Sequence, residues 1–464
     1  MIRLLFYIMT FEALLMPVTT HAHPQIVLKT HELAGLPKVS HKVSIGLSGT
    51  DTATVNWGDG ESNSYILTES ETQCTHSYSI PDTSEPFDRT ITINGNITVL
   101  RCNYSQLTYL DVSRDTALLQ LYCNRNWITH LDVSKNTALT HLDCGRNGLT
   151  HLDVSTNVGL THLDCGVNAL THLDVSQTHA LLELNCSYNG LIDLDLTKNA
   201  ELMKLDYSSC THLMNLDISK NRALTSLICN NNEFTGLDIS KNTALTELDC
   251  SYCPHLTNLD ISKNVLLQEL DCHKSSLIRL DVTNNIKLSD LNCWTNQLTS
   301  LDVSKNTSLK RLNCNNNQLS DLDVSKNISL THLFCTNNQL TSLAINSNTS
   351  LTNLKCSNNR LTRLDISKNT ALEWLECDNN QLKSLDARTN TVLQELNLES
   401  NKFSVIALHK LFSTLHDKPI ITTTMQVKTV YIEHNPGTFF CITTVAAIKG
   451  WKVIKFHPRP VWWG

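Results

Sequence analysis

Close copies of the segment LTHLDCGRNGLTHLDVSTNVG, residues 139–159, recur along most of the chain, and this repetition determines the fold. The cysteine of this segment belongs to a series in which the same position returns at every twenty-first residue. Two units, 202–223 and 245–266, carry one extra residue. Tyr207 takes the cysteine position in the first of these, and Leu398 takes it in the last unit. Such a fixed period is the sequence signature of a repeat architecture. The series is Cys102, Cys123, Cys144, Cys165, Cys186, Cys229, Cys250, Cys272, Cys293, Cys314, Cys335, Cys356 and Cys377.

Within one unit the apolar positions form a single stripe, which no unit can bury alone. In residues 309–329 nearly everything between the apolar side chains is polar. Stacking solves the problem, because parallel strands about 4.8 Å apart let each coil cover its neighbour. We therefore predict a solenoid of about 15 coils over residues 97–403. The stripe of this unit is Leu309, Leu312, Cys314, Leu319, Leu322 and Val324.

Asparagine recurs three residues after the cysteine position, which we call the asparagine position. An amide turned inward there can satisfy backbone N–H and C=O groups that would otherwise be buried without partners. Cys210 and Cys253 replace it in the two longer units, and Ser105 and Ser275 replace it in two others. The asparagines are Asn126, Asn147, Asn168, Asn189, Asn232, Asn296, Asn317, Asn338, Asn359, Asn380 and Asn401.

The pattern L-x-x-L-x-C-x-x-N-x-L resembles the leucine-rich repeat. Its continuation LDVSKNTAL is similar to the internalin-type, cysteine-bearing repeats of secreted Bacteroidetes-type surface proteins. The resemblance covers about two thirds of the chain. It implies parallel strands on a concave face, a mostly irregular or 3-10 helical convex side, and binding of proteins or glycans on the concave face. It implies no catalysis.

Three interpretations of the role of the cysteine series are open. A thiol in a leucine position behaves as a small buried hydrophobe, and this packing role is the one we expect. A series of disulfides is the first alternative, because exported proteins often contain them. In-register side chains on parallel strands fit the required torsion poorly, however. A zinc site is the weaker alternative, because no C-x-x-C pair meets a second such pair.

Both ends of the chain depart from the repeat. Residues 23–96 alternate as strands do, and VNWGDG followed by His76 resembles the PKD-like, immunoglobulin-type β-sandwich, so we predict a small β module that also caps the first coil. Residues 404–464 predict a small α/β C-terminal cap, with apolar residues at helical spacing from Val405 to Leu415.

Residues 1–22 predict a signal peptide, because an apolar run follows Arg3 and small residues end it. We therefore expect an extracellular or cell-surface protein with no membrane span after signal cleavage. The chain has 37 Lys plus Arg against 44 Asp plus Glu and no basic block, so nucleic acid is not an expected partner. We found no catalytic motif and expect neither an enzyme nor a cofactor.

Residues that alternate with the inward leucines should point onto the concave face. They predict a ligand-binding surface that is acidic in its first half and rich in exposed aromatic rings. A weaker candidate is a metal site from His141, Asp143, His162 and Asp164 on neighbouring strands. The predicted ligand-binding residues are Tyr122, Asp143, Asp164, Tyr188, Asp206, Asp249, Tyr252, Asp271, Trp294, Phe334 and Trp374.

These features favour an adhesin or host-interaction protein that binds a protein partner. Two alternatives stay open. Trp294, Phe334 and Trp374 could be stacking platforms for a glycan, or the solenoid could be a structural spacer without a ligand of its own.

Overall fold

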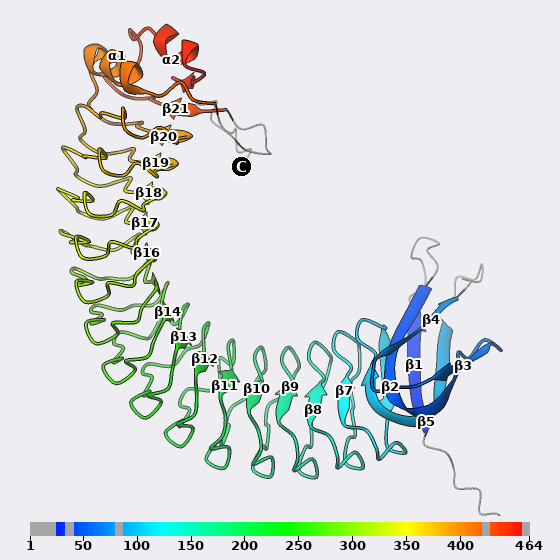
Figure 1. Ribbon diagram of the computed structural model, residues 1–464. Coiled ribbons are helices and arrows are strands. Elements are labelled where there is room, and N and C mark those ends of the chain that lie inside the picture. Colours follow the sequence, from blue (N-terminus) through cyan, green and yellow to red (C-terminus); the bar gives the residue numbers. More distant parts are fainter. Residues whose placement is uncertain (1–24, 33–40, 79–86, 420–426, 457–464) are drawn as a thin grey trace, which may run out of the picture.

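The protein forms an arc of stacked coils between an N-terminal β module and a small C-terminal cap (Figure 1). The computed structural model describes residues 25–32, 41–78, 87–419 and 427–456, so the predicted signal peptide lies outside the described residues. Two helices are described, α1 (Val405–Thr414) and α2 (Thr444–Ile448). The strands of the two ends are β1 (Gln25–Glu32), β2 (His41–Asn56), β3 (Ser62–Ile66), β4 (Thr72–Tyr78), β5 (Phe87–Arg101), β6 (Leu107–Asp111), β21 (Thr429–Tyr431) and β22 (Lys452–Ile454). The strands between them are β7 (Gln120–Tyr122), β8 (His141–Asp143), β9 (His162–Asp164), β10 (Glu183–Asn185), β11 (Lys204–Asp206), β12 (Ser226–Ile228), β13 (Glu247–Asp249), β14 (Glu269–Asp271), β15 (Asp290–Asn292), β16 (Arg311–Asn313), β17 (His332–Phe334), β18 (Asn353–Lys355), β19 (Trp374–Glu376) and β20 (Glu395–Asn397).

The N-terminal module is an antiparallel sheet that shares a strand with the solenoid. β2 pairs with β3, β4 and β5, and β1 pairs with β5 and β6. The end of β5 then pairs in parallel with β7, the first regular strand of the stack. Trp57 of the VNWGDG motif is fully buried, and its carbonyl accepts a hydrogen bond from the Tyr78 hydroxyl at 2.7 Å. The resemblance of this module to a PKD-like domain stays a prediction.

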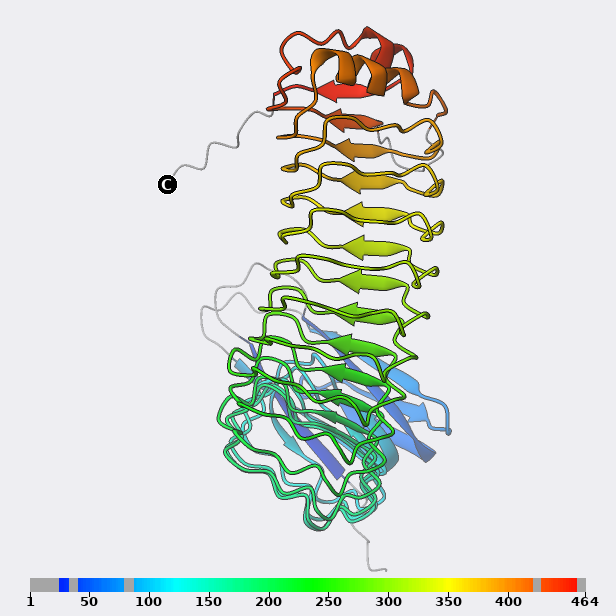
Figure 2. The ribbon, with the colours of Figure 1, turned by 90° about the vertical axis from the view of Figure 1, so that its left-hand side faces the viewer.

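The strands of the solenoid form a parallel stack (Figure 2). From β7 to β21 each strand has three residues, of which only the middle one is buried. Equivalent residues of successive coils are in register, as Leu291, Leu312 and Leu333 show. The other half of each coil consists of turns, and residues 97–403 contain no helix of any type. The fold predicted from the repeat is therefore confirmed, with turns where irregular or 3-10 structure was expected.

The stack has about 17 turns, two more than the repeat period predicts. The additional strands lie in the region expected to be only a cap, where β21 pairs in parallel with β20, and β22 pairs in parallel with β21. Ile432 and Asn435 repeat the cysteine and asparagine positions there, and the Asn435 side chain donates to Leu398 O at 2.8 Å. The sequence period is lost there because α1 takes the place of the turns between β20 and β21.

All 17 cysteines are free and buried, so the packing interpretation of the cysteine series is the one that this structure supports. Each of the thirteen in the series is 0% exposed. Burial is the main cause that raises the pKa of nearly all of these thiols, in the case of Cys314 to about 12, so they stay protonated in the folded chain. The structure describes no group of three or more His, Cys, Asp or Glu side chains that could hold a metal ion.

The predicted inward asparagines bond to backbone groups of two coils. Asn317 is typical, because its Nδ2 donates to Cys293 O at 3.0 Å and to Cys314 O at 3.2 Å. Its Oδ1 accepts from the backbone N–H of Leu298 at 3.0 Å. One side chain therefore satisfies buried backbone groups of both coils. These bonds hold the two coils at a fixed spacing and stabilise the turn after the strand.

A second asparagine series, which the sequence interpretation missed, lies on the opposite side of the core. Asn306 is 0% exposed and donates from Nδ2 to Val282 O at 2.9 Å and to Asn285 O at 2.8 Å in the preceding coil. In the sequence, this second series is the asparagine that ends the recurring LDVSKN segment. The series is Asn136, Asn157, Asn199, Asn221, Asn242, Asn264, Asn285, Asn306, Asn327, Asn348, Asn369 and Asn390.

In the first coil, Asp115 occupies the position that the second asparagine series has in the other coils. The adjacent backbone presents an N–H donor there, that of Ile97. Asp115 is 0% exposed, and its Oδ2 accepts from the Ile97 backbone N–H at 3.2 Å. Burial raises the pKa of the Asp115 carboxyl to about 6. The folded state therefore binds this proton more tightly than the unfolded chain, whose aspartates have a pKa of about 3.9.

Asp115 should consequently make stability depend on pH. Its contribution is fully present below the unfolded pKa and is lost as the pH rises through about 6. We expect the unfolding free energy of the natural chain, measured relative to Asp115→Asn, to fall by on the order of 2 kcal/mol between pH 4 and pH 7. Urea unfolding of both proteins at the two pH values measures the difference. An equal difference at both values contradicts the assignment.

Candidate functional site

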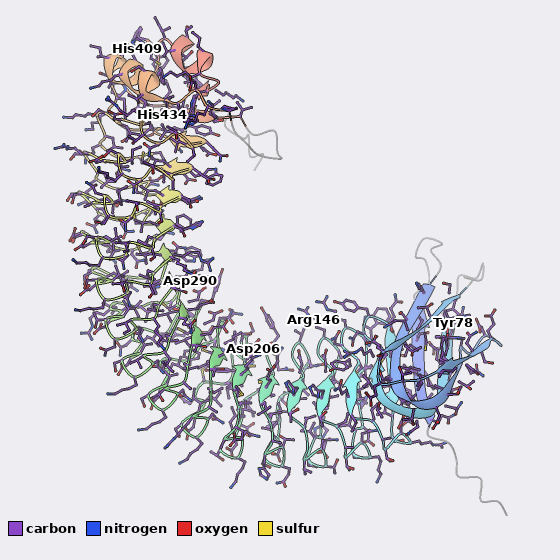
Figure 3. All side chains as sticks on the ribbon, viewed as in Figure 1. Tyr78, Arg146, Asp206, Asp290, His409 and His434 are labelled. Carbon is purple, nitrogen blue, oxygen red and sulfur yellow. The ribbon has the colours of Figure 1, made fainter. Side chains whose placement is uncertain are left out.

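The candidate site is the strand-lined inner surface of the arc, where the first and third residue of each strand face outward from the core. The first residues of the strands, such as Glu269, form one column, and the third residues, such as Asp271, form a second column beside it. Figure 3 places Asp206 and Asp290 on the inner side of the arc. Neighbouring members of a column belong to adjacent parallel strands about 4.8 Å apart. The columns therefore place side chains from distant parts of the sequence on one continuous surface.

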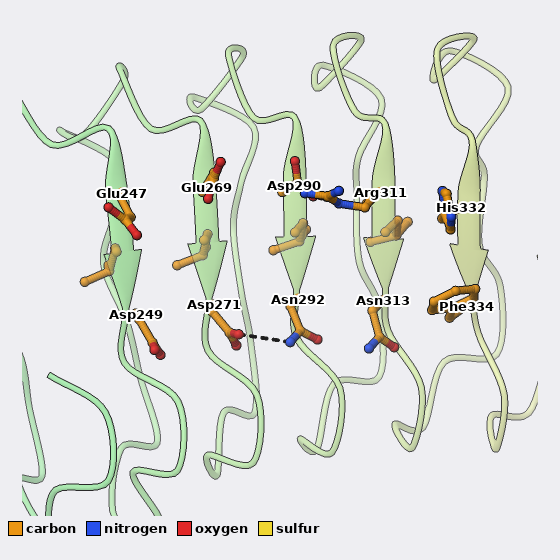
Figure 4. Close-up of a pocket in the computed structure, with 14 residues that line it drawn as sticks. Glu247, Asp249, Glu269, Asp271, Asp290, Asn292, Arg311, Asn313, His332 and Phe334 are labelled. Atoms are coloured by element: carbon orange, nitrogen blue, oxygen red, sulfur yellow. Dashed lines mark hydrogen bonds and ion pairs between the residues drawn. The ribbon is translucent and has the colours of Figure 1, made fainter. Parts of the chain in front are cut away.

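A hollow of about 380 Å³ lies over strands β13 to β17, and we call it the acidic hollow (Figure 4). Its wall combines five carboxylates with one aromatic ring, so it joins charge to apolar area. Three of the predicted ligand-binding residues, Asp249, Asp271 and Phe334, thus lie together in this hollow. Its outward-facing residues are Glu247, Asp249, Glu269, Asp271, Asp290, Asn292, Arg311, Asn313, His332 and Phe334.

Like charges lie side by side at one end of the acidic hollow. Glu247 is in register with Glu269, and Asp249 with Asp271. Burial raises the pKa of Asp249, against hydrogen bonds from Ser251 that lower it. At the other end the charge is balanced, because Arg311 forms an ion pair with Asp290. The excess negative charge is therefore concentrated over β13 and β14, where a cationic group of a partner would be stabilised.

A second hollow of about 400 Å³ lies over β7 to β12, and we call it the histidine hollow. Tyr122, Asp143, Asp164 and Asp206 all line it, as their shared column predicts. The guanidinium of Arg101 lies 3.6 Å from the centre of the Tyr122 ring, so one face of this ring is occupied. Burial raises the pKa of both Asp143 and Asp164, with Asp143 as a further cause for Asp164.

His141 and His162 stack in the histidine hollow with ring centroids 4.2 Å apart. The Thr140 hydroxyl donates to Leu119 O at 3.1 Å, so it can only accept from Nδ1 of His141, 2.9 Å away. Thr161 repeats the arrangement with His162. Each ring is therefore held as the Nδ1–H tautomer. Burial, and then the neighbouring His162, lower the pKa of His141, which keeps it neutral near pH 7.

The four residues of the weak metal candidate do not form one ligand set. Asp143 bonds to the Asn124 side chain, and Asp164 accepts from Gly166 N at 2.9 Å. Asp143 thus accepts from a turn of the preceding coil and Asp164 from the turn that follows its own strand, while the two imidazoles stack on each other. Across the described part of the chain no set of three potential ligands is arranged for a metal ion.

Three of the predicted aromatic residues lie beyond the strands, at the rim of the concave face. Tyr188 and Tyr252 occupy turn positions with a φ of 52° and 53° and are 56% and 42% exposed. Tyr188 lines a shallow hollow of about 490 Å³ that also contains Asp143, Asp164 and Asp206. The structure therefore connects it to the histidine hollow, although it is not part of a strand.

The other rim aromatics form a cluster with two basic residues that the sequence interpretation did not single out. We call Tyr252, His273, Lys274 and Trp294 the rim cluster. The rings of His273 and Trp294 stack at 5.0 Å, and Tyr252 meets His273 edge-on at 4.7 Å. Lys274 Nζ lies 4.5 Å from the Tyr252 ring centre and 4.8 Å from that of Trp294. Trp374 lies apart from these groups, on β19.

Solved structures of other proteins share this architecture. The functional domain of InlJ from Listeria monocytogenes, which includes a cysteine ladder, is 34% identical, with a TM-score of 0.66 over 73% of this chain and 74% of that chain. A leucine-rich repeat protein of Leptospira interrogans is 24% identical, with a TM-score of 0.62 over 68% of this chain and 93% of that chain. The Toll–Spatzle complex from Drosophila matches at 17% identity, with a TM-score of 0.56 over 74% of this chain and 52% of that chain, which shows the fold alone. No protein-family model and no curated protein sequence matches the chain.

Proposed function

Because the chain belongs to the internalin-like leucine-rich repeat proteins with a cysteine ladder, we propose that it is an exported protein that binds a protein partner on its concave face. The Bacteroidetes-type resemblance and the PKD-like module are part of the same proposal. Export rests on the apolar leader in residues 1–22. No helix in the described ranges is long and apolar enough to cross a membrane.

The observation that carries the proposal is the acidic hollow. It combines four carboxylates on β13 and β14, of which Asp271 is paired with His273, with the Phe334 ring on one strand face. The asparagine and cysteine series lie in the core behind this face. Protein interfaces gain most of their affinity from such aromatic groups, while complementary charge steers the partner. A protein segment with basic and apolar side chains fits this surface. A host or cell-surface protein of that character would make the chain an adhesin.

The ring geometry favours a protein over a glycan. A sugar that stacks on a ring needs an open ring face. The Trp294 ring stacks on His273 with an interplanar angle of 9°, and Lys274 lies over the same ring. Phe334 has Lys355 Nζ 5.6 Å from its ring centre, and the His332 ring is nearly perpendicular to it, with ring centroids 6.0 Å apart. Side chains of the protein itself therefore contact two of the three rings that the glycan hypothesis requires, which leaves less ring surface open to a flat sugar.

The test is a binding comparison with a partner captured from extracellular matrix or host-surface extract. We expect the double variant Glu269→Lys, Phe334→Ala to weaken binding at least tenfold, about 1.4 kcal/mol, because it reverses charge and removes the aromatic group in one hollow. Affinity is measured by surface plasmon resonance at two salt concentrations. The natural chain should lose affinity at the higher concentration, because salt screens the attraction.

The matched control is Asp321→Lys, Ile328→Ala. It makes the same kinds of change at exposed positions of one coil outside the strand face. This control should bind as the natural chain does. Equal loss of affinity in both variants, or binding to a glycan array that Phe334→Ala and Trp374→Ala abolish, contradicts the proposal. A chain that captures nothing in either screen favours the spacer hypothesis.

A further inference from the structure

The two longer coils share a substitution that the other coils lack. Both place a cysteine at the asparagine position, Cys210 in unit 202–223 and Cys253 in unit 245–266. The preceding coil contributes a cysteine of the series in each case, Cys186 before Cys210 and Cys229 before Cys253. The extra residue and the cysteine thus occur together twice.

A cysteine cannot replace the bonds of the asparagine. Asn232 in a regular coil donates from Nδ2 to Tyr207 O and Cys229 O, at 3.1 and 2.9 Å. The thiol of Cys210 has a single weak donor, and its Sγ lies 3.3 Å from Cys186 O. Cys210 is therefore held against the cysteine of the preceding coil but contributes little hydrogen bonding there.

The surroundings of Cys186 differ from those of the other cysteines in the series. The next coil has Tyr207 at the cysteine position, so the cysteine that meets Cys186 from that coil is Cys210. Cys210 Sγ lies 3.3 Å from Cys186 O, and the two thiols are close enough that each shifts the pKa of the other, upward for Cys186 and downward for Cys210. Cys253 instead bonds to carbonyl groups, Cys229 O at 3.6 Å and Ser251 O at 3.4 Å.

The geometric objection to disulfides within the series does not apply to this pair. Neighbouring cysteines of the series occupy equivalent positions on parallel strands, so their side chains run parallel and fit a torsion near 90° poorly. Cys186 and Cys210 occupy different positions of their coils. Cys186 directly follows β10, whereas Cys210 lies in the turn after β11, four residues beyond the end of that strand, and both side chains are 0% exposed.

We propose that Cys186 and Cys210, free thiols in this structure, form a disulfide between adjacent coils when the chain folds in an oxidising compartment. The proposal rests on the proposed export, because the cytosol keeps thiols reduced. Since both thiols are buried, the bond forms while the coils are still assembling. It would fasten β10 to β11 behind the histidine hollow, at the place where the regular asparagine bonds are missing.

The reaction is an exchange with a small-molecule disulfide such as oxidised glutathione. One protein thiolate attacks a sulfur of glutathione disulfide, which forms a mixed disulfide and releases one glutathione thiol. The second protein thiolate attacks the protein sulfur of the mixed disulfide, which forms the bond between Cys186 and Cys210 and releases the second glutathione. The two cysteines lose two protons and two electrons, and glutathione disulfide gains both.

The experiment refolds the full chain in a glutathione redox buffer and, in parallel, in excess reductant. The folded monomer of each sample is unfolded in acid, alkylated and weighed by mass spectrometry. We expect all but two of the 17 thiols to be alkylated in the oxidised sample and all of them in the reduced sample. Fragmentation of the proteolytic peptides should locate the bond between Cys186 and Cys210. The unfolding temperature of the oxidised sample should be the higher one.

Two variants separate this bond from other oxidation. Cys210→Ala should leave every remaining thiol free to alkylate and should remove the difference in unfolding temperature. Cys253→Ala should retain the bond and the difference. Complete alkylation of the folded, oxidised natural chain overturns the proposal, as does a bond located at Cys229, Cys250 or Cys253. Because the experiment needs neither a partner nor export, these outcomes leave the proposed binding function untouched.

Discussion

Replacing Asn285 with alanine should lower the unfolding free energy by about 2 to 3 kcal/mol. Asn285 is 0% exposed, and its Nδ2 donates to Ile261 O at 3.1 Å and to Asn264 O at 2.8 Å. The variant removes one of the two hydrogen bonds that each carbonyl accepts, since Asn264 N also donates to Ile261 O at 3.0 Å and Leu267 N to Asn264 O at 3.1 Å. Each lost hydrogen bond contributes about 0.5 to 1.5 kcal/mol. The measurement is urea unfolding followed by circular dichroism.

The neighbouring Asn284 provides the control. Its side chain is exposed and makes a single long contact, from Nδ2 to Ser262 O at 3.4 Å. Asn284→Ala should therefore change stability by no more than about 0.5 kcal/mol. Equal effects of the two variants would mean that the second asparagine series does not hold the coils together.

Replacing Leu312 with alanine should cost about 3 kcal/mol and should act locally. The side chain is 1% exposed and lies in register with Leu291 and Leu333 of the adjacent coils. Truncating a buried leucine removes apolar contacts and leaves a cavity, at about 2 to 5 kcal/mol. Because each coil contacts only its neighbours, the weakened interfaces are those on either side of β16.

Hydrogen exchange measures this local effect directly. We expect faster exchange in the strands and turns of the coils around β15, β16 and β17, and unchanged exchange near β7 and β8. Ile328→Ala, at a position that is 60% exposed, is the control and should leave the exchange pattern as it is. Uniformly faster exchange along the whole stack would show that the coils unfold as one unit, which contradicts the nearest-neighbour description.

The repeat period predicts the solenoid because the same physical requirement returns in every coil. Leu312 and Cys314 can be assigned to the core from position alone, since no residue at their positions in other coils is charged. The inward role of Asn317 follows from the same reasoning. The second series escaped notice because its members, such as Asn306, stand in a polar segment where burial is not evident. Their recurrence once in nearly every repeat unit was the available signal.

The ends and the rim could not be predicted in the same way. β21 continues the stack, but α1 precedes it, so Val430 and Ile432 no longer follow the period. Sequence position placed the columns of the concave face correctly, because alternation along a strand fixes the side on which a residue lies. It could not show that Trp294 stacks on His273, since ring contacts depend on side-chain rotamers and on turns between coils.

A hydrogen-exchange footprint of the captured protein partner on the full chain tests whether the partner binds on the concave face. We expect slower exchange on binding in strands β13 to β17, which form the acidic hollow, and no change in the turns on the convex side. Slower exchange confined to the convex turns or to the N-terminal module, with β13 to β17 unchanged, would contradict binding on the concave face.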